Sequence, residues 1–355
     1  MINKKNKKRV LIAISLFIMV FLLSNNYYNN TNYYNNIDNN VKNGQYLKSD
    51  VFISSDVIFD NKESLNQPIG IRENPVTSEY VVADYGNNCL YIFSHNGKYI
   101  KKVGREGQGP GDLLRPRYLF IDIYGNIYVY EGGNLRISIF SKEGKFINSF
   151  RININNQLCR FYVSENKEII FSMPQRGYYI TIYDIKGNII KEIGKLVIIN
   201  KDEIINQSLS LGIPIKTSDD NYYIFINGLG IINKYNEKGE KINAYSYPEA
   251  INGYLNYDFS ESKLSKLKYA SVPVLGADII LRNNLIYIFD YYIIKKLNME
   301  MKLLDTFQID PKTKLYNDPE ALSMYVFFEL NDSVNNIEFF LPALNSSEIL
   351  KYYNK

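Results

Sequence analysis

The chain has 355 residues, of which 46% are hydrophobic, so it can bury one large core or two ordinary ones. Its net charge is +4, but five basic residues lie before residue 10 and the remainder carries −1, which excludes the basic surface typical of nucleic-acid-binding proteins. The 32 tyrosines and 19 phenylalanines, with abundant isoleucine and asparagine, favour β-strands joined by tight turns.

Residues 1–24 have the layout of an export signal. A basic stretch is followed by the apolar run Val10–Ser24, which is shorter than the ~20 residues of a spanning helix. No small-residue cleavage site and no lipid-accepting cysteine follow it, so we expect either cleavage near Ser24 or retention as a signal anchor. The predicted location is exported, in the periplasm or at the cell surface. Residues 25–47 are rich in Asn and Tyr and are predicted to be a disordered linker.

A turn recurs along residues 48–355, which we predict to be one domain. The sequences "IFSHNGKYIKKVG", "FSKEGKFINSF", "IYDIKGNIIKEIG" and "KYNEKGEKINAY" align on the turn glycines Gly97, Gly144, Gly187 and Gly239, which are 43 to 52 residues apart. A fifth copy, "KLNMEMKLLDTF", lacks the glycine. Each copy contains four short segments joined by Gly/Asn turns, which indicates a four-stranded antiparallel meander.

This period predicts an all-β fold, a six-bladed β-propeller. Five full blades are expected at residues 66–104, 117–150, 157–194, 209–246 and 276–308. After them the chain supplies three more strands, so we predict that the N-terminal strand within Asp50–Phe59 closes the last blade. A β-sandwich is the alternative, but it would not place the same turn at the same offset five times.

The run "GREGQGPGD", Gly104 to Asp112, could pass for a phosphate-binding loop. Such a loop needs a helix after it and Lys-Ser/Thr at its end, whereas strand-like sequence follows here. We therefore interpret the run as a connection between two blades, in which the glycines permit sharp turns.

The stretch "GREGQGPGDLLRPRYLFID", followed by "GNIYVYEGGNLRISIFSKEGKFI", resembles exported six-bladed β-propeller proteins common in Bacteroidetes, which are similar to NHL-repeat propellers. The resemblance covers residues 48–355 and is strongest over Val81–Gly194. It implies an exported, often lipid-anchored protein without an assigned activity. The chain lacks the lipid-accepting cysteine and has Leu113 where the family has an aromatic residue.

Charged residues gather where the blade connections meet. In a propeller, the loops that enter each inner strand share a face with the turns joining the second and third strands, and loops on a rigid ring often bind ligands. An arginine pair there could hold a carboxylate or sulfate. The plainer alternative is a solvated loop with internal salt bridges. The candidate binding residues are Arg105, Asp112, Arg115, Arg117, Asp84 and Glu131.

We predict no catalytic residue, no metal ligand and no cofactor. The only histidine, His95, lies in a hairpin turn, which argues against a zinc site or a catalytic triad. The predicted function is a non-catalytic, monomeric binding or scaffold protein. Its expected partner is an envelope protein, peptide or glycan rather than nucleic acid, and only its N-terminal segment is expected to contact membrane. The alternative is a propeller-type hydrolase or lyase with an oxygen-ligated metal, such as calcium.

Overall fold

A computed structural model gives the fold of the protein. It describes residues 50–57, 65–152, 160–226, 229, 231–246, 265, 278–290, 293–309, 329–333, 336–342 and 349–354. The predicted signal segment at 1–24 and the predicted linker at 25–47 lie outside the described residues.

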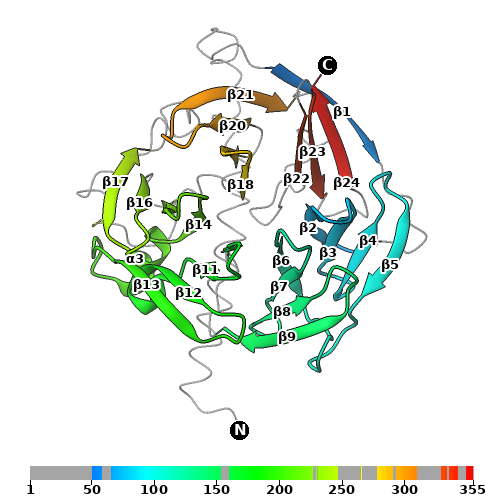
Figure 1. Cartoon of the computed structure of the whole chain (residues 1–355), viewed down its shortest axis with the longest axis horizontal. Helices are drawn as coiled ribbons and strands as arrows, with labels where there is room; N and C mark the ends of the chain where they lie inside the picture. The colour runs from blue at the N-terminus through cyan, green and yellow to red at the C-terminus, as the bar shows by residue number, and fades with distance from the viewer. Residues whose placement is uncertain are drawn as a thin grey trace.

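The strands form six antiparallel blades arranged around an axis (Figure 1). Four blades are separate four-stranded sheets, and the fifth and sixth are joined in one eight-stranded sheet. The first three blades are β2(Pro68–Glu73), β3(Tyr80–Asp84), β4(Cys89–Phe93), β5(Tyr99–Val103); β6(Pro116–Ile121), β7(Ile127–Glu131), β8(Arg136–Phe140), β9(Phe146–Arg151); and β10(Phe161–Val163), β11(Ile169–Phe171), β12(Tyr178–Tyr183), β13(Ile189–Lys195). The last three are β14(Gly212–Lys216), β15(Tyr222–Ile226), β16(Ile231–Tyr235), β17(Lys241–Ser246); β18(Asp278–Arg282), β19(Leu285–Asp290), β20(Ile293–Leu297), β21(Leu303–Ile309); and β22(Glu329–Ser333), β23(Asn336–Pro342), β24(Ile349–Asn354) with β1(Asp50–Val57).

The N-terminal strand closes the ring, as the sequence predicts. β1 pairs antiparallel with β24, with Phe52 opposite Asn354, and so becomes the outer strand of the sixth blade. β1 also pairs in parallel with β21, the outer strand of the fifth blade. The two ends of the chain therefore meet in one blade, and β1 covers two strand edges that would otherwise be unpaired.

The recurring turn has the same geometry in the first five blades. In each blade the third and fourth strands are joined by a hairpin, with a bulge beside the turn. The glycine of this turn has φ between +78° and +87° at Gly97, Gly144, Gly187 and Gly239. The fifth copy keeps the left-handed backbone without glycine, because Met301 adopts φ +61° there.

The hydrophobic core lies between the blades rather than inside any one of them. The middle strands β3, β4, β7 and β8 are buried along their whole length, because a neighbouring blade covers each of their faces. One cluster joins the first blade to the second through Val81, Leu90, Leu119 and Val129. Buried tyrosines such as Tyr128 fill the next cluster, between the second and third blades.

The turn glycines also bring neighbouring blades together. A Cβ on Gly144 would lie 2.5 Å from Cγ2 of Val103, in the outer strand of the preceding blade. The same relation holds one blade further on, where a Cβ on Gly187 would lie 2.6 Å from Phe150. Glycine is therefore required at these two turns by packing as well as by the positive φ.

The ring has two faces that differ in their connections. We call the connector face the one that holds the loops entering the inner strands and the turns between the second and third strands. We call the hairpin face the opposite one, which holds the remaining turns. The connection between β13 and β14 lies on the connector face and contains the short helix α3(Glu203–Leu209), which Asp202 caps by accepting hydrogen bonds from the N–H groups of Ile204 and Ile205.

Candidate functional site

The connection between β5 and β6, residues 104–115, folds back on itself at the connector face. Gly104 and Gly111 have φ of +78° and +80°. The N–H of Leu113 donates to the carbonyl of Arg105 at 2.7 Å, and the N–H of Gly107 donates to the carbonyl of Leu113 at 3.2 Å. Leu113 is fully buried in the cluster between the first two blades. A strand, β6, follows the glycine run, so the loop is a structural connection and not a phosphate-binding loop.

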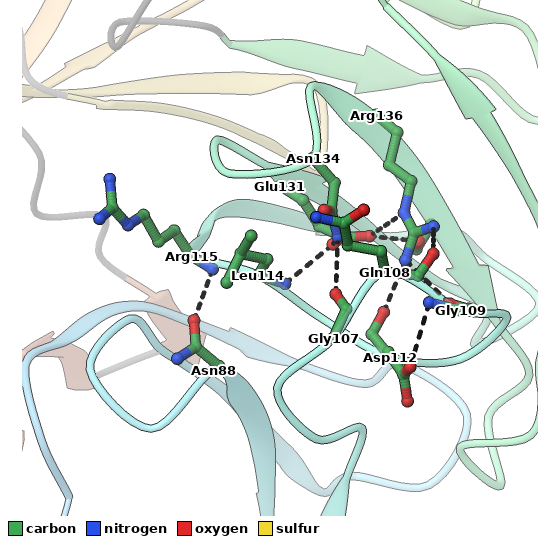
Figure 2. A network of polar contacts seen from close by, with 11 residues as sticks. Asn88, Gly107, Gln108, Gly109, Asp112, Leu114, Arg115, Glu131, Asn134 and Arg136 are labelled. Carbon is green, nitrogen blue, oxygen red and sulfur yellow. Dashed lines mark hydrogen bonds and ion pairs between the residues drawn. The ribbon is translucent and has the colours of Figure 1, made fainter.

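Glu131, at the end of β7, holds this connection in place (Figure 2). Its carboxylate has no exposed surface and accepts hydrogen bonds from the N–H of Leu114 at 2.9 Å and from Nδ2 of Asn134 at 2.6 Å. It also accepts from Nε of Arg136 at 2.7 Å and from the hydroxyl of Ser138. A buried carboxylate is stable only when such donors surround it, and here they come from the β5–β6 connection, the β7–β8 turn and β8.

Arg136 completes the network from the opposite strand, β8. Its guanidinium donates to the carbonyl oxygens of Gln108 at 2.8 Å, Gly109 at 3.1 Å and Asp112 at 2.8 Å. One side chain thus fixes three carbonyl groups of the connection while its own charge is neutralised by Glu131. These three hydrogen bonds from a buried side chain hold the loop in one conformation.

Asp84 occupies the position in the first blade that Glu131 occupies in the second. Its carboxylate is buried and accepts hydrogen bonds from the N–H groups of Asn66 at 2.7 Å and Asn87 at 2.9 Å. Burial raises the pKa of Asp84, and the N–H groups of Asn66 and Asn87 oppose this shift. Asp84 therefore stabilises its own turn and does not face solvent.

The four remaining predicted residues belong to the connection or to the start of β6. Asp112 accepts from Nε of Arg105 at 2.9 Å, and the Arg105 hydrogen bond lowers the pKa of Asp112. The guanidinium of Arg117 lies over the ring of Tyr85, 5.1 Å from its centroid. The side chain of Arg115 is exposed and extends away from the network (Figure 2).

The structure therefore brings the six predicted residues to one face but gives them different surroundings. Asp84 and Glu131 are buried in hydrogen-bond networks, whereas Arg105 and Arg115 are exposed. The backbone of Arg115 is unusual, because its φ is +52° and its N–H donates to Oδ1 of Asn88 at 2.7 Å.

Sequence reasoning missed Asn88, Asn134, Arg136 and Ser138, of which the last three build the network with Glu131. One signal could have found the charged pair. Glu131 and Arg136 are directly opposite each other in the β7–β8 hairpin, and both are charged residues at the ends of otherwise apolar strands.

A second polar cluster spans the axis of the ring. Nη2 of Arg72, in β2, lies 2.7 Å from Oδ2 of Asp278, in β18, although these strands belong to the first and fifth blades. The guanidinium groups of Arg72 and Arg160 lie 5.5 and 5.6 Å from the ring centroid of Tyr118. Burial, the largest cause, raises the pKa of Tyr118 to about 12. The cluster therefore connects the first, second, third and fifth blades. Asp278 contributes the carboxylate that pairs with Arg72.

Within the described residues, no group of three or more His, Cys, Asp or Glu side chains is placed to hold a metal ion. The same part of the chain has no helix whose length and apolarity would suit a membrane span. His95 lies in the hairpin turn of the first blade and is stacked on Tyr80, with ring centroids 5.8 Å apart.

Comparison with known sequences supports the propeller resemblance. Residues 74–227 match a protein family described as a 6-bladed beta-propeller. Protein brain tumor of Drosophila melanogaster is 28% identical over 130 residues, which cover 36% of this chain and 12% of that protein. The chain thus spans about an eighth of the length of this curated relative.

Solved structures share the fold at low sequence identity. A protein of Bacteroides fragilis NCTC 9343, named for its expected export, is 12% identical, with a TM-score of 0.53 over 87% of this chain and 97% of that one. A catalytically inactive histidine-to-alanine variant of virginiamycin B lyase from Staphylococcus aureus, solved with quinupristin, is 13% identical, with a TM-score of 0.51 over 86% of this chain and 99% of that one. These likenesses show the architecture, and the predicted resemblance to six-bladed propellers is confirmed.

Proposed function

Because the chain is a β-propeller whose residues 74–227 match a six-bladed propeller family, we propose that it is a non-catalytic binding or scaffold protein of the cell envelope. The connector face holds the partner, which presents an acidic group. Export is part of the proposal; its supports are the basic and apolar layout of residues 1–24 and the fold shared with a Bacteroides fragilis protein named for its export.

The observation that carries the proposal is the exposed Arg115 on a rigid loop. A left-handed backbone costs a residue other than glycine about 1 kcal/mol, and at Arg115 the Asn88 hydrogen bond holds the backbone in that conformation. The network of Glu131 and Arg136 fixes the loop before any partner arrives, so little conformational entropy is lost on binding. A guanidinium presented in this way suits bidentate recognition of a carboxylate or sulfate.

The enzyme alternative has less support from the site. The chain shares its fold with a lyase whose histidine-to-alanine variant is inactive, but at 13% identity the shared fold carries no activity. The only histidine of this chain, His95, lies in the β4–β5 hairpin, on the face opposite the predicted binding loops.

The test is affinity capture from an envelope extract with the full chain and three variants. Wild type should retain a partner that Arg115→Ala retains at least about 10-fold less well, since losing a charge-assisted hydrogen bond costs roughly 1.5–3 kcal/mol. Arg115→Lys should recover only part of the binding, because lysine cannot make the bidentate contact.

Lys186→Ala is the matched control. Lys186 is an equally exposed cation, but it lies in the β12–β13 hairpin on the other face, so its loss should leave capture unchanged. Equal capture by wild type and Arg115→Ala, with unaltered melting of both, would remove Arg115 from the binding surface.

A further inference from the structure

The hairpin face repeats one exposed aliphatic side chain from blade to blade. In each of the first five blades it lies three residues after the left-handed turn residue, at the second position of the outer strand. These side chains, which we call the rim aliphatics, are between 42% and 52% exposed. They are Ile100, Ile147, Ile190, Ile242 and Leu304.

Other exposed apolar side chains lie in the turns of the same face. Val76 and the pair Ile123 and Tyr124 belong to turns between first and second strands, and Ile185 belongs to the β12–β13 hairpin. The turn that carries Ile185 contacts β9, the strand that carries Ile147, since the Ile185 carbonyl accepts a hydrogen bond from Nδ2 of Asn148 at 2.8 Å. Among the described residues, exposed large apolar side chains of the connector face are confined to Val197, Ile198 and Ile204.

The chain also enters the ring at the hairpin face. In the first blade, Phe93 and Tyr99 are opposite each other beside the hairpin turn. In the sixth blade, Asn354 and Phe52 hold the corresponding positions, so the two ends of the chain take the place of the turn. The strand β1 therefore begins, at Asp50, on this face.

Charge does not select the partner of this face. The five hairpin turns, residues 94–98, 141–145, 184–188, 236–240 and 298–302, and the five turns between first and second strands, residues 74–79, 122–126, 164–168, 217–221 and 283–284, together contain seven lysines and eleven acidic residues. This excess of acidic residues does not attract anionic headgroups, so contact with a bilayer depends on the regularly spaced aliphatic side chains.

We propose that the hairpin face lies on the surface of a phospholipid bilayer, with the rim aliphatics inserted at the headgroup boundary. Each side chain contributes little alone, but a second attachment through the N-terminal segment would raise its effective concentration at the membrane. The connector face then points away from the bilayer, where its loops are free to bind.

The absence of tryptophan from the sequence provides a direct test. Ile190→Trp places a single fluorophore on the hairpin face, and Ile198→Trp places one on the connector face at another exposed isoleucine. Each full-length variant is reconstituted into phosphatidylethanolamine–phosphatidylglycerol vesicles whose acyl chains carry bromine near the headgroup. Tryptophan emission should be quenched at least about 2-fold more strongly in Ile190→Trp than in Ile198→Trp, and raising the salt should not weaken the quenching of Ile190→Trp, because salt screens repulsion between the acidic turns and the anionic lipid.

Two further variants make the result specific to the aliphatic side chains. Ile147→Thr with Ile242→Thr, introduced together into the Ile190→Trp chain, should reduce its quenching, because threonine keeps the strand preference but loses apolar surface. Val197→Thr in the same chain is the control and should leave quenching unchanged. Equal quenching of the two fluorophores, quenching of Ile198→Trp alone, or quenching of neither would each overturn the proposal.

Discussion

The hairpin face of the ring repeats one turn from blade to blade, whereas the connections of the opposite face differ. The hairpin turn of the second blade, closed by a 2.8 Å hydrogen bond from the N–H of Gly144 to the carbonyl of Ser141, has close counterparts in four other blades. The 104–115 connection is fixed instead by the buried pair of Glu131 and Arg136, and a later connection of the same face contains the helix α3. Repetition thus serves ring assembly, while the loops of the connector face vary in length and conformation.

Ring closure is the sharpest exception to the repetition, because the sixth hairpin has no turn. Deleting residues 50–57 should have the largest effect, since β21 and β24 would each lose a paired strand. We expect the cooperative thermal transition to disappear or to fall by many degrees, as followed by circular dichroism. Deleting the predicted linker at 25–47 is the control and should leave the melt unchanged. A deletion of β1 that melts like wild type would contradict closure.

Breaking the buried pair of Glu131 and Arg136 on the connector face should give the next largest loss of stability. Glu131→Gln removes the charge that neutralises Arg136, so the free energy of unfolding should fall by about 3 kcal/mol. Denaturant titration measures this loss, and Glu143→Gln, at an exposed carboxylate of the hairpin face, should change little. A loss for Glu131→Gln no larger than for the control would show that the connection does not depend on this pair.

A pair of glycine substitutions separates the two demands on the repeated turn. Gly144→Ala introduces both an unfavourable positive φ and a contact with Val103 in the adjacent blade, so it should destabilise by roughly 2–3 kcal/mol. Gly177, in the connector-face turn before β12, has φ +84°, but a Cβ added there would meet no heavy atom within 4 Å, so Gly177→Ala should cost only about 1 kcal/mol. Equal losses in urea denaturation would mean that the blade contact does not constrain the hairpin.

The smallest expected effect is the pH dependence of the connection. The Arg105 hydrogen bond lowers the pKa of Asp112 below its ordinary value of 3.8. The stabilisation from the Arg105–Asp112 ion pair is therefore fully present above pH 3.8 and is lost as the pH falls through the lowered pKa. Carboxyl chemical shifts of Asp112, measured by NMR, should report the lowered midpoint. Arg105→Gln should return it toward 3.8, and an unchanged midpoint in that variant would assign the shift to another group.

The repeated part of the molecule was predictable because local chemistry determines it. Glycines that recur every 43 to 52 residues identified the hairpins, and even Met301, which breaks the glycine pattern, keeps the left-handed turn because its blade imposes the same geometry. The six candidate binding residues lie on one face, as their positions in the repeat predict, yet the sequence did not show that Asp84 and Glu131 are buried. The ion pair of Arg72 and Asp278 could not be foreseen, since it depends on the relative placement of two non-adjacent blades.

The pairing of Phe52 with Asn354 has a consequence for biosynthesis. These partners are about 300 residues apart, and the loop-closure entropy between them is lost only after the final strand has been synthesised. Until then the first blades present uncovered sheet faces and strand edges to their surroundings. An incomplete chain of this kind is therefore prone to aggregate until β24 is available to pair with β1.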